Sequence, residues 1–125
     1  MAKGKLSASY QTDKHQIEIG VEVLTWAEDN IHFMYVPSLD VTGYGNTETE
    51  AKRSFKITLN EFIKYTFNKQ TIFDELERLG WTVNRKKKRA QQPQKNELIE
   101  DNDFLKTLLN KQDLKKEIRE VSLAL

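Results

Sequence analysis

Histidines and carboxylates are the residues of this sequence whose types could support catalysis. The 125 residues include two histidines, His15 and His32, and no cysteine. A histidine acts as a catalytic base when a nucleophile and an orienting acid lie beside it, and neither histidine has such partners nearby in the sequence. The two are not at metal-ligand spacing either. We therefore predict no catalytic residue, no metal site and no cofactor, with His32 an ordinary sheet residue and His15 exposed to solvent.

Five carboxylates offer an alternative chemistry. Glu18 and Glu22 share one face of a predicted strand, and Glu28, Asp29 and Asp40 follow around the same predicted sheet. Clustered carboxylates can hold magnesium and hydrolyse phosphodiesters. The simpler interpretation, which we favour, is that they form the polar outer face of the sheet.

The glycines around Tyr44 superficially resemble a phosphate-binding loop. Gly43 and Gly45 lack the further glycine and the lysine of such loops, so a tight turn into a helix is the better interpretation. Thr47 and Glu50 form a capping-box pattern, in which the Thr47 hydroxyl accepts from the Glu50 amide and the Glu50 carboxylate accepts from the Thr47 amide. The backbone amides at this helix start could bind an anion.

A run of five cations is the main indication of nucleic-acid binding. Residues 1–84 carry nine Lys and Arg against twelve Asp and Glu, whereas residues 85–125 carry eleven against seven, so the charges are −3 and +4. The run could neutralise several phosphates, but no aromatic residue is interleaved with it. A solvated linker is the alternative interpretation. The run consists of Arg85, Lys86, Lys87, Lys88 and Arg89.

The elements that position these residues predict an α+β fold. Apolar residues alternate from Gln16, the stretch 31–36 is almost entirely apolar, and residues 40–44 are suited to a short strand, which together predict a three-stranded antiparallel meander. Leu24 and Trp26 change parity, which indicates a bulge or a strand buried on both faces. Polar residues 27–30 form the first predicted turn.

Two helices and a short fourth strand are expected next, giving the order β-β-β-α-α-β. The long helix has an apolar stripe at spacings of three and four: Ala51, Phe55, Thr58, Leu59, Phe62, Ile63 and Thr66. Thr71 and Asp74 suggest a cap for the short helix, which Gly80 ends. Residues 81–83 would return to the sheet as the last strand, with Trp81 in the core.

The remainder of the chain is predicted to be an appendage. We expect an α+β domain over residues 1–84, in which 1–14 are undecided, then a basic linker over 85–96 and an amphipathic helical tail over 97–125. Asn102 or Asp103 would cap one tail helix, which carries Phe104, Leu105, Leu108 and Leu109. Asp113 would cap a second, in which Leu114, Ile118, Val121 and Leu125 share a face. Such a tail is too small to form its own core, so it should pack on the body, on a second copy or on a partner.

Composition restricts the class of protein. Hydrophobic residues make up 38% and charged residues 31% of the chain, as in soluble proteins. No stretch approaches the roughly 18 apolar residues of a membrane span, and the start lacks the apolar run of a signal peptide. We expect a cytoplasmic protein without a membrane partner. The lack of cysteine excludes disulfides and thiolate chemistry.

The segment from Val36 to Ala51 resembles HicB-like antitoxins. Their hallmark runs Pro-Asp-Leu, a glycine-containing turn, and Gly-x-Thr-x-x-Glu-Ala at a helix start. The matching positions are Pro37, Leu39, Gly43, Gly45, Thr47, Glu50 and Ala51. Ser38 stands where the family usually has Asp, and the turn is about one residue shorter. The resemblance covers about residues 16–66.

This resemblance implies a partial ribonuclease-H-like core without catalysis. It also implies a homo-oligomer that binds and neutralises a small basic HicA-like toxin that cleaves messenger RNA. The predicted partner interface consists of Trp26, Phe33, Tyr35 and Tyr44. A stand-alone HicB-like protein that binds nucleic acid or acts in regulation through residues 85–89 is the alternative function.

Overall fold

The computed structural model describes residues 5–7 and 16–125, and its class is α+β. The expectation for His15 lies outside the described residues. The strands are β1 (Lys5–Ser7), β2 (Gln16–Glu28), β3 (Ile31–Val36), β4 (Val41–Gly45), β5 (Thr82–Asn84), β6 (Arg89–Gln91) and β7 (Lys115–Ala124). The helices are α1 (Glu48–Asn68), α2 (Ile72–Arg78), α3 (Lys95–Glu100) and α4 (Asp103–Leu109).

The predicted antiparallel meander is confirmed. Strands β2, β3 and β4 are consecutive neighbours in a five-stranded sheet of order β1-β7-β2-β3-β4. The first turn is tighter than expected, because Glu28 pairs with Ile31 and leaves Asp29 and Asn30 as a two-residue loop. Both loop residues have positive φ, 53° and 66°, as tight hairpin turns require.

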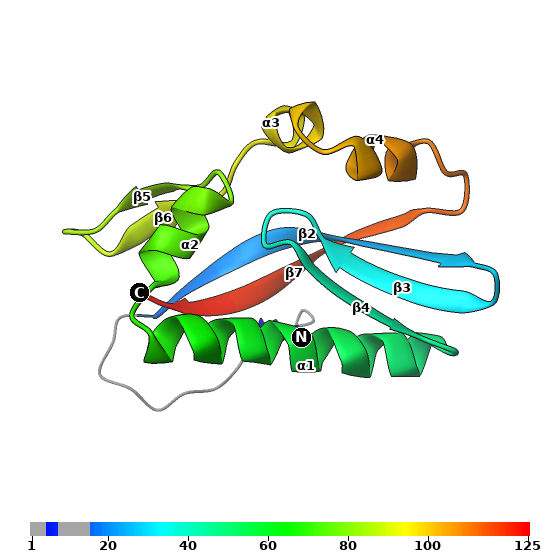
Figure 1. Ribbon diagram of the computed structural model, residues 1–125, viewed down its shortest axis with the longest axis horizontal. Coiled ribbons are helices and arrows are strands. Elements are labelled where there is room, and N and C mark those ends of the chain that lie inside the picture. Colours follow the sequence, from blue (N-terminus) through cyan, green and yellow to red (C-terminus); the bar gives the residue numbers. More distant parts are fainter. Residues whose placement is uncertain (1–4, 8–15) are drawn as a thin grey trace.

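Strand β2 is buried on both of its faces, and no bulge interrupts its pairing. Val21 and Val23 contribute to a core beneath α1, while Leu24 and Trp26 contribute to a second core beneath α4. Figure 1 shows α1 along one face of the sheet and α3 and α4 over the other. The parity change in the sequence therefore marks the point where β2 passes from one core to the other.

Helix α1 forms as its apolar stripe predicts. Ala51, Phe55, Leu59, Ile63 and Thr66 are buried. The Thr47 hydroxyl accepts from the Glu50 amide at 3.1 Å, as expected. The Glu50 carboxylate, however, accepts from the amide of Asn46 at 2.9 Å, one residue before the predicted donor. The cap thus extends into the turn that leads from β4.

Helix α2 ends at Arg78, and the predicted stop residue Gly80 follows its C-cap Leu79 with a φ of 95°. Its predicted side-chain cap is absent, since Thr71 occupies the N-cap position but makes no cap hydrogen bond through its side chain. Trp81 is buried, and its indole nitrogen donates to the Ser38 carbonyl at 2.7 Å. This bond fastens the end of α2 to the β3–β4 turn.

The predicted fourth strand exists but does not join the main sheet. Residues Thr82–Asn84 form β5, which pairs with β6 in a separate two-stranded hairpin. The prediction of a basic linker over residues 85–96 is therefore wrong for the part that forms β6 and its turn. Strand β5 pairs instead with Arg89, the last residue of the basic run, and with Ala90 and Gln91, which follow it.

The predicted helix from Asp113 to Leu125 is wrong, because these residues form the inner strand β7. Ten consecutive residues pair with β2, from Lys115 opposite Thr25 to Ala124 opposite Gln16. Val121, Leu123 and Leu125 alternate toward the α1 core, whereas Ile118 is 65% exposed. The spacing of four and three fitted a helix, but pairing with a distant strand decides the conformation.

The first of the two predicted tail helices is confirmed as α4. Asn102 caps α4 by accepting from the Leu105 amide at 2.9 Å. Within residues 5–7 and 16–125, none of the helices combines the length and apolar character that crossing a membrane requires.

Candidate protein interface

The four aromatic residues predicted at a partner interface lie together on the sheet face opposite α1. The Trp26 and Phe33 rings stack with centroids 5.1 Å apart, and the Phe33 and Tyr44 rings are 6.4 Å apart. The positions are brought together by pairing, since Trp26 lies opposite Phe33, which in turn lies opposite Tyr44. Tyr35 lies two residues further along β3, on the same face.

Helix α4 adds a fifth aromatic residue, Phe104, that the sequence analysis assigned only to the apolar side of a tail helix. Its ring meets Trp26 edge-on at 6.1 Å and Tyr35 at 5.8 Å. Leu105 and Leu108 are the residues of α4 that enter the core. Phe104 comes one residue before Leu105 and so lies off the helix face that buries Leu105 and Leu108. This position is the sequence signal that its side chain stays at the surface.

These five residues, which we call the aromatic patch, are graded from buried to exposed. Trp26 and Tyr35 are buried, Phe33 is half-buried, and Tyr44 and Phe104 are 64% and 53% exposed. Exposed aromatic rings over a rigid, buried aromatic base are typical of the centre of a protein interface.

Tyr35 and Asn102 connect the sheet to α4 beneath the patch. The Asn102 amide donates to the Tyr35 hydroxyl at 3.1 Å while its oxygen caps α4. Burial raises the pKa of the Tyr35 phenol, and the nearby Asp40 carboxylate raises it further, whereas the bond to Asn102 acts in the opposite direction. The phenol stays neutral at physiological pH and serves as a fixed hydrogen-bonding group.

Exposed carboxylates lie near two parts of the patch. Asp40 lies near the Tyr35 hydroxyl, and the segment leading into Phe104 contains Glu100, Asp101 and Asp103, all exposed. The Asp103 side chain is fully exposed and meets Lys106 at 3.7 Å, a distance and exposure at which such pairs contribute little. The patch therefore has an apolar centre with carboxylates near Asp40 and Phe104. Near Trp26 and Phe33 its border is basic as well as acidic, because both residues line a groove with lysines, an arginine and carboxylates.

The hallmark residues hold the strand-turn-helix junction in place. Pro37 and Leu39 are buried in the β3–β4 turn. Gly43 lies directly against α1, where a side chain would overlap the backbone of Phe55, and at Gly45 a side chain would overlap Glu50. Thr47 and Glu50 cap the helix, and Ala51 is buried beneath it. Every one of these residues has a structural role at this junction.

The basic run is located at the β5–β6 turn rather than in a linker. Arg85 donates to Asp74 and Glu77 at 2.8 and 2.6 Å, and its guanidinium lies 5.5 Å from the centre of the Phe73 ring. Hydrogen bonds to these two carboxylates raise the pKa of Arg85 above its ordinary range. The other four cations are exposed.

Two of the five carboxylates considered for a magnesium site form ion pairs with lysines. Glu22 meets Lys95 at 3.4 Å and Glu28 meets Lys111 at 3.3 Å. Among the residues that the structure describes, no group of three His, Cys, Asp or Glu side chains could hold a metal ion. His32 borders a groove of about 570 Å³ between the sheet and the start of α1. The groove is also lined by Trp26 and Phe33 and has mixed charges, which come from Lys52, Lys115, Lys116, Arg119, Glu48, Asp113 and Glu117.

Comparisons of the chain with protein-family models, with curated proteins and with solved structures find no match.

Proposed function

We propose that this protein is a non-enzymatic HicB-like antitoxin-type module that binds and neutralises a small basic toxin that cleaves messenger RNA. The aromatic patch, with the exposed carboxylates near Asp40 and Phe104, is the observation that carries the proposal. The resemblance of residues 36–51 to the HicB hallmark supplies the identity of the partner, a HicA-like toxin. Self-association into a homo-oligomer belongs to the same proposal.

The chemistry of the patch suits a basic partner. Phe33, Tyr44 and Phe104 supply the rigid apolar surface from which interfaces derive most of their binding energy. Asp40, Asp101 and Asp103 would steer a cationic protein toward that surface and disfavour acidic competitors.

The proposal is tested by measuring whether this protein binds the product of the adjacent gene. The test applies where that product is a small basic ribonuclease. Tyr44→Ala and Phe104→Ala should each weaken the complex by roughly 2 kcal/mol, or about 30-fold in Kd, because each removes an anchoring ring. Isothermal titration calorimetry measures this change. The solution mass of the free protein and of the complex, measured by light scattering, reports the oligomeric state.

Tyr65→Ala provides the matched control. Tyr65 is 63% exposed, almost the same as Tyr44, but it lies on α1 at the opposite side of the sheet. Its replacement should change Kd by less than about twofold, since surface substitutions outside an interface have small effects. Equal losses for Tyr44→Ala and Tyr65→Ala, or an adjacent ribonuclease that does not bind, would contradict the proposal.

A further inference from the structure

The five cations of the basic run divide into one that is internally neutralised and four that are not. Arg85 is held by Asp74 and Glu77 and packs on Phe73. In the described part of the chain, no ion pair involves the four remaining cations, which are Lys86, Lys87, Lys88 and Arg89. Sequence alone would count five equivalent charges, whereas the structure leaves four available to a ligand.

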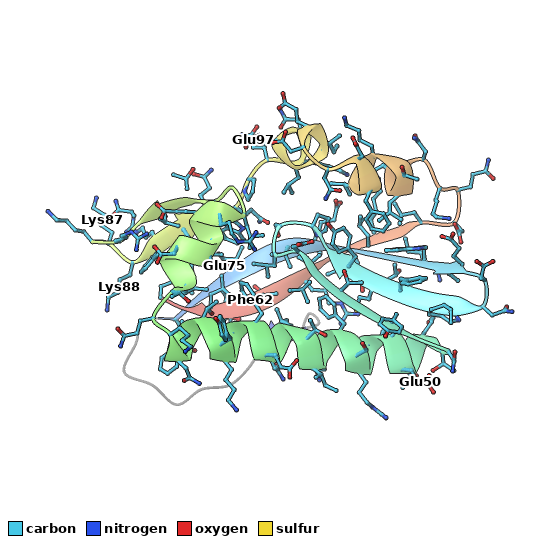
Figure 2. All side chains as sticks on the ribbon, in the orientation of Figure 1. Glu50, Phe62, Glu75, Lys87, Lys88 and Glu97 are labelled. Atoms are coloured by element: carbon cyan, nitrogen blue, oxygen red, sulfur yellow. The ribbon has the colours of Figure 1, made fainter. Side chains whose placement is uncertain are left out.

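The carboxylates nearest to the turn are already paired. On α2, Asp74 and Glu77 hold Arg85, and Glu75 holds Arg78. These three carboxylates are held by two arginines, Arg78 and Arg85, and none of them pairs with a lysine of the turn. Figure 2 shows Lys87 and Lys88 directed away from the body at the end of the hairpin, while Glu75 lies back toward it.

The turn is held in a defined conformation. The Asn84 side chain accepts from the Lys87 amide at 3.0 Å, and Lys88 has a φ of 53°, which allows β6 to begin at Arg89. Val83 and Ala90, which face each other in the hairpin, pack against the main core. The Gln92 side chain donates to the Gly20 carbonyl at 2.6 Å. The lysines are thus presented by an anchored hairpin.

We infer that the tip of the β5–β6 hairpin binds the phosphate backbone of a nucleic-acid duplex through Lys86, Lys87, Lys88 and Arg89. Closely spaced lysines match closely spaced phosphates, and their binding releases counterions. The run from Arg85 to Arg89 contains no aromatic residue on which unpaired bases could stack, so a duplex fits better than a single strand. Lysine is depleted in protein interfaces, which makes an acidic protein the weaker alternative.

The contacts are to phosphates, so binding should be independent of sequence and strongly dependent on salt. Fluorescence anisotropy of the full chain with labelled DNA and RNA duplexes of about 20 base pairs measures both properties. We expect affinity for duplex DNA to fall on the order of 150-fold between about 50 and 200 mM NaCl, as four phosphate contacts require. Binding to either duplex supports the inference, and the two probes show which backbone geometry is preferred.

The triple variant Lys86→Gln/Lys87→Gln/Lys88→Gln should lose at least about tenfold in affinity at 50 mM NaCl and most of the salt dependence. The matched control is Lys52→Gln/Lys56→Gln/Lys64→Gln, which changes the net charge equally with exposed lysines of α1. The control should bind as the unaltered protein does. Circular dichroism confirms that both variants remain folded.

Several outcomes would overturn the inference. These are no duplex binding at 50 mM NaCl, equal losses in the two triple variants, preferential binding to single strands, or equally tight binding to polyglutamate. The inference is separate from the toxin-binding proposal. Tyr44→Ala should leave duplex binding unchanged, and the hairpin variant should leave toxin binding unchanged, so failure of one proposal is distinguishable from failure of the other.

Discussion

At the residue scale, Ser38 is an unusual member of the core. Its side chain is 3% exposed, and its hydroxyl oxygen has no hydrogen-bond partner among the described residues. Its carbonyl, in contrast, accepts from Trp81. A buried hydroxyl without a partner carries a desolvation cost of about 1–3 kcal/mol. The backbone of this position therefore contributes to stability, while its side chain does not.

Replacing Ser38 tests this assignment. Ser38→Ala should raise the free energy of unfolding by about 1 kcal/mol, because it removes an unpaired polar group and keeps the carbonyl. Ser38→Asp, which introduces the residue usual in HicB-like proteins, should lower it by roughly 3 kcal/mol or more by burying an unpaired charge. Urea unfolding at neutral pH measures both changes. A stabilising Ser38→Asp would show that the turn offers a partner for the carboxylate.

At the element scale, the start of α1 depends on a cap that reaches into the preceding turn. The Thr47 hydroxyl satisfies the Glu50 amide, and the Glu50 carboxylate satisfies Asn46. Strand β4 is also linked to α1 directly, since the Tyr44 amide donates to the Ser54 hydroxyl at 3.2 Å. These bonds fix the helix against the edge strand β4, whose exposed edge would otherwise be open to pairing.

Thr47→Ala should lower the free energy of unfolding by about 1 kcal/mol, because it removes the acceptor of the cap. Thr49→Ala is the matched control, since Thr49 is exposed within the first turn of α1 and makes no cap hydrogen bond. Alanine is the better helix former, so the control should be neutral or slightly stabilising. Chemical denaturation distinguishes the two, and equal effects would argue against the cap.

At the scale of the whole molecule, β7 integrates the C-terminal segment into the domain. It lies between β1 and β2 in the sheet, and Val121 and Leu123 enter the same core as α1. A separate domain over residues 1–84 would lack this strand and its share of the core. The second core, beneath α4, is likewise built from both parts of the chain, because Leu105 and Leu108 pack with Leu24 and Trp26.

Substitutions on the two faces of β7 test this integration. Val121→Asp should lower the free energy of unfolding by roughly 3 kcal/mol or more, because Val121 is fully buried and the carboxylate would have no partner. Ile118→Asp is the control, since Ile118 lies on the opposite face and is 65% exposed, and it should cost less than about 1 kcal/mol. Thermal and urea unfolding measure both. Similar small effects would indicate a tail that is dispensable for the fold.

The local patterns of the sequence determined the α+β class, the meander, the position of α1 and its Thr47 cap, and the glycine stop after α2. They also placed the α4 cap at Asn102 or Asp103, of which the structure uses Asn102. Each depends on neighbours a few residues away, so alternation, helical spacing and cap residues are enough to predict it. The sequence also supplied the prediction of a partner interface at Trp26, Phe33, Tyr35 and Tyr44.

Tertiary structure alone decided the rest. The residues after Asp113 fit a helical spacing, but ten pairs with β2, a strand almost a hundred residues earlier in the chain, made them a strand. Contact across the fold brought Phe104 to the aromatic patch and neutralised Arg85 within the basic run. These outcomes depend on long-range pairing and packing, whose partners a local pattern cannot identify.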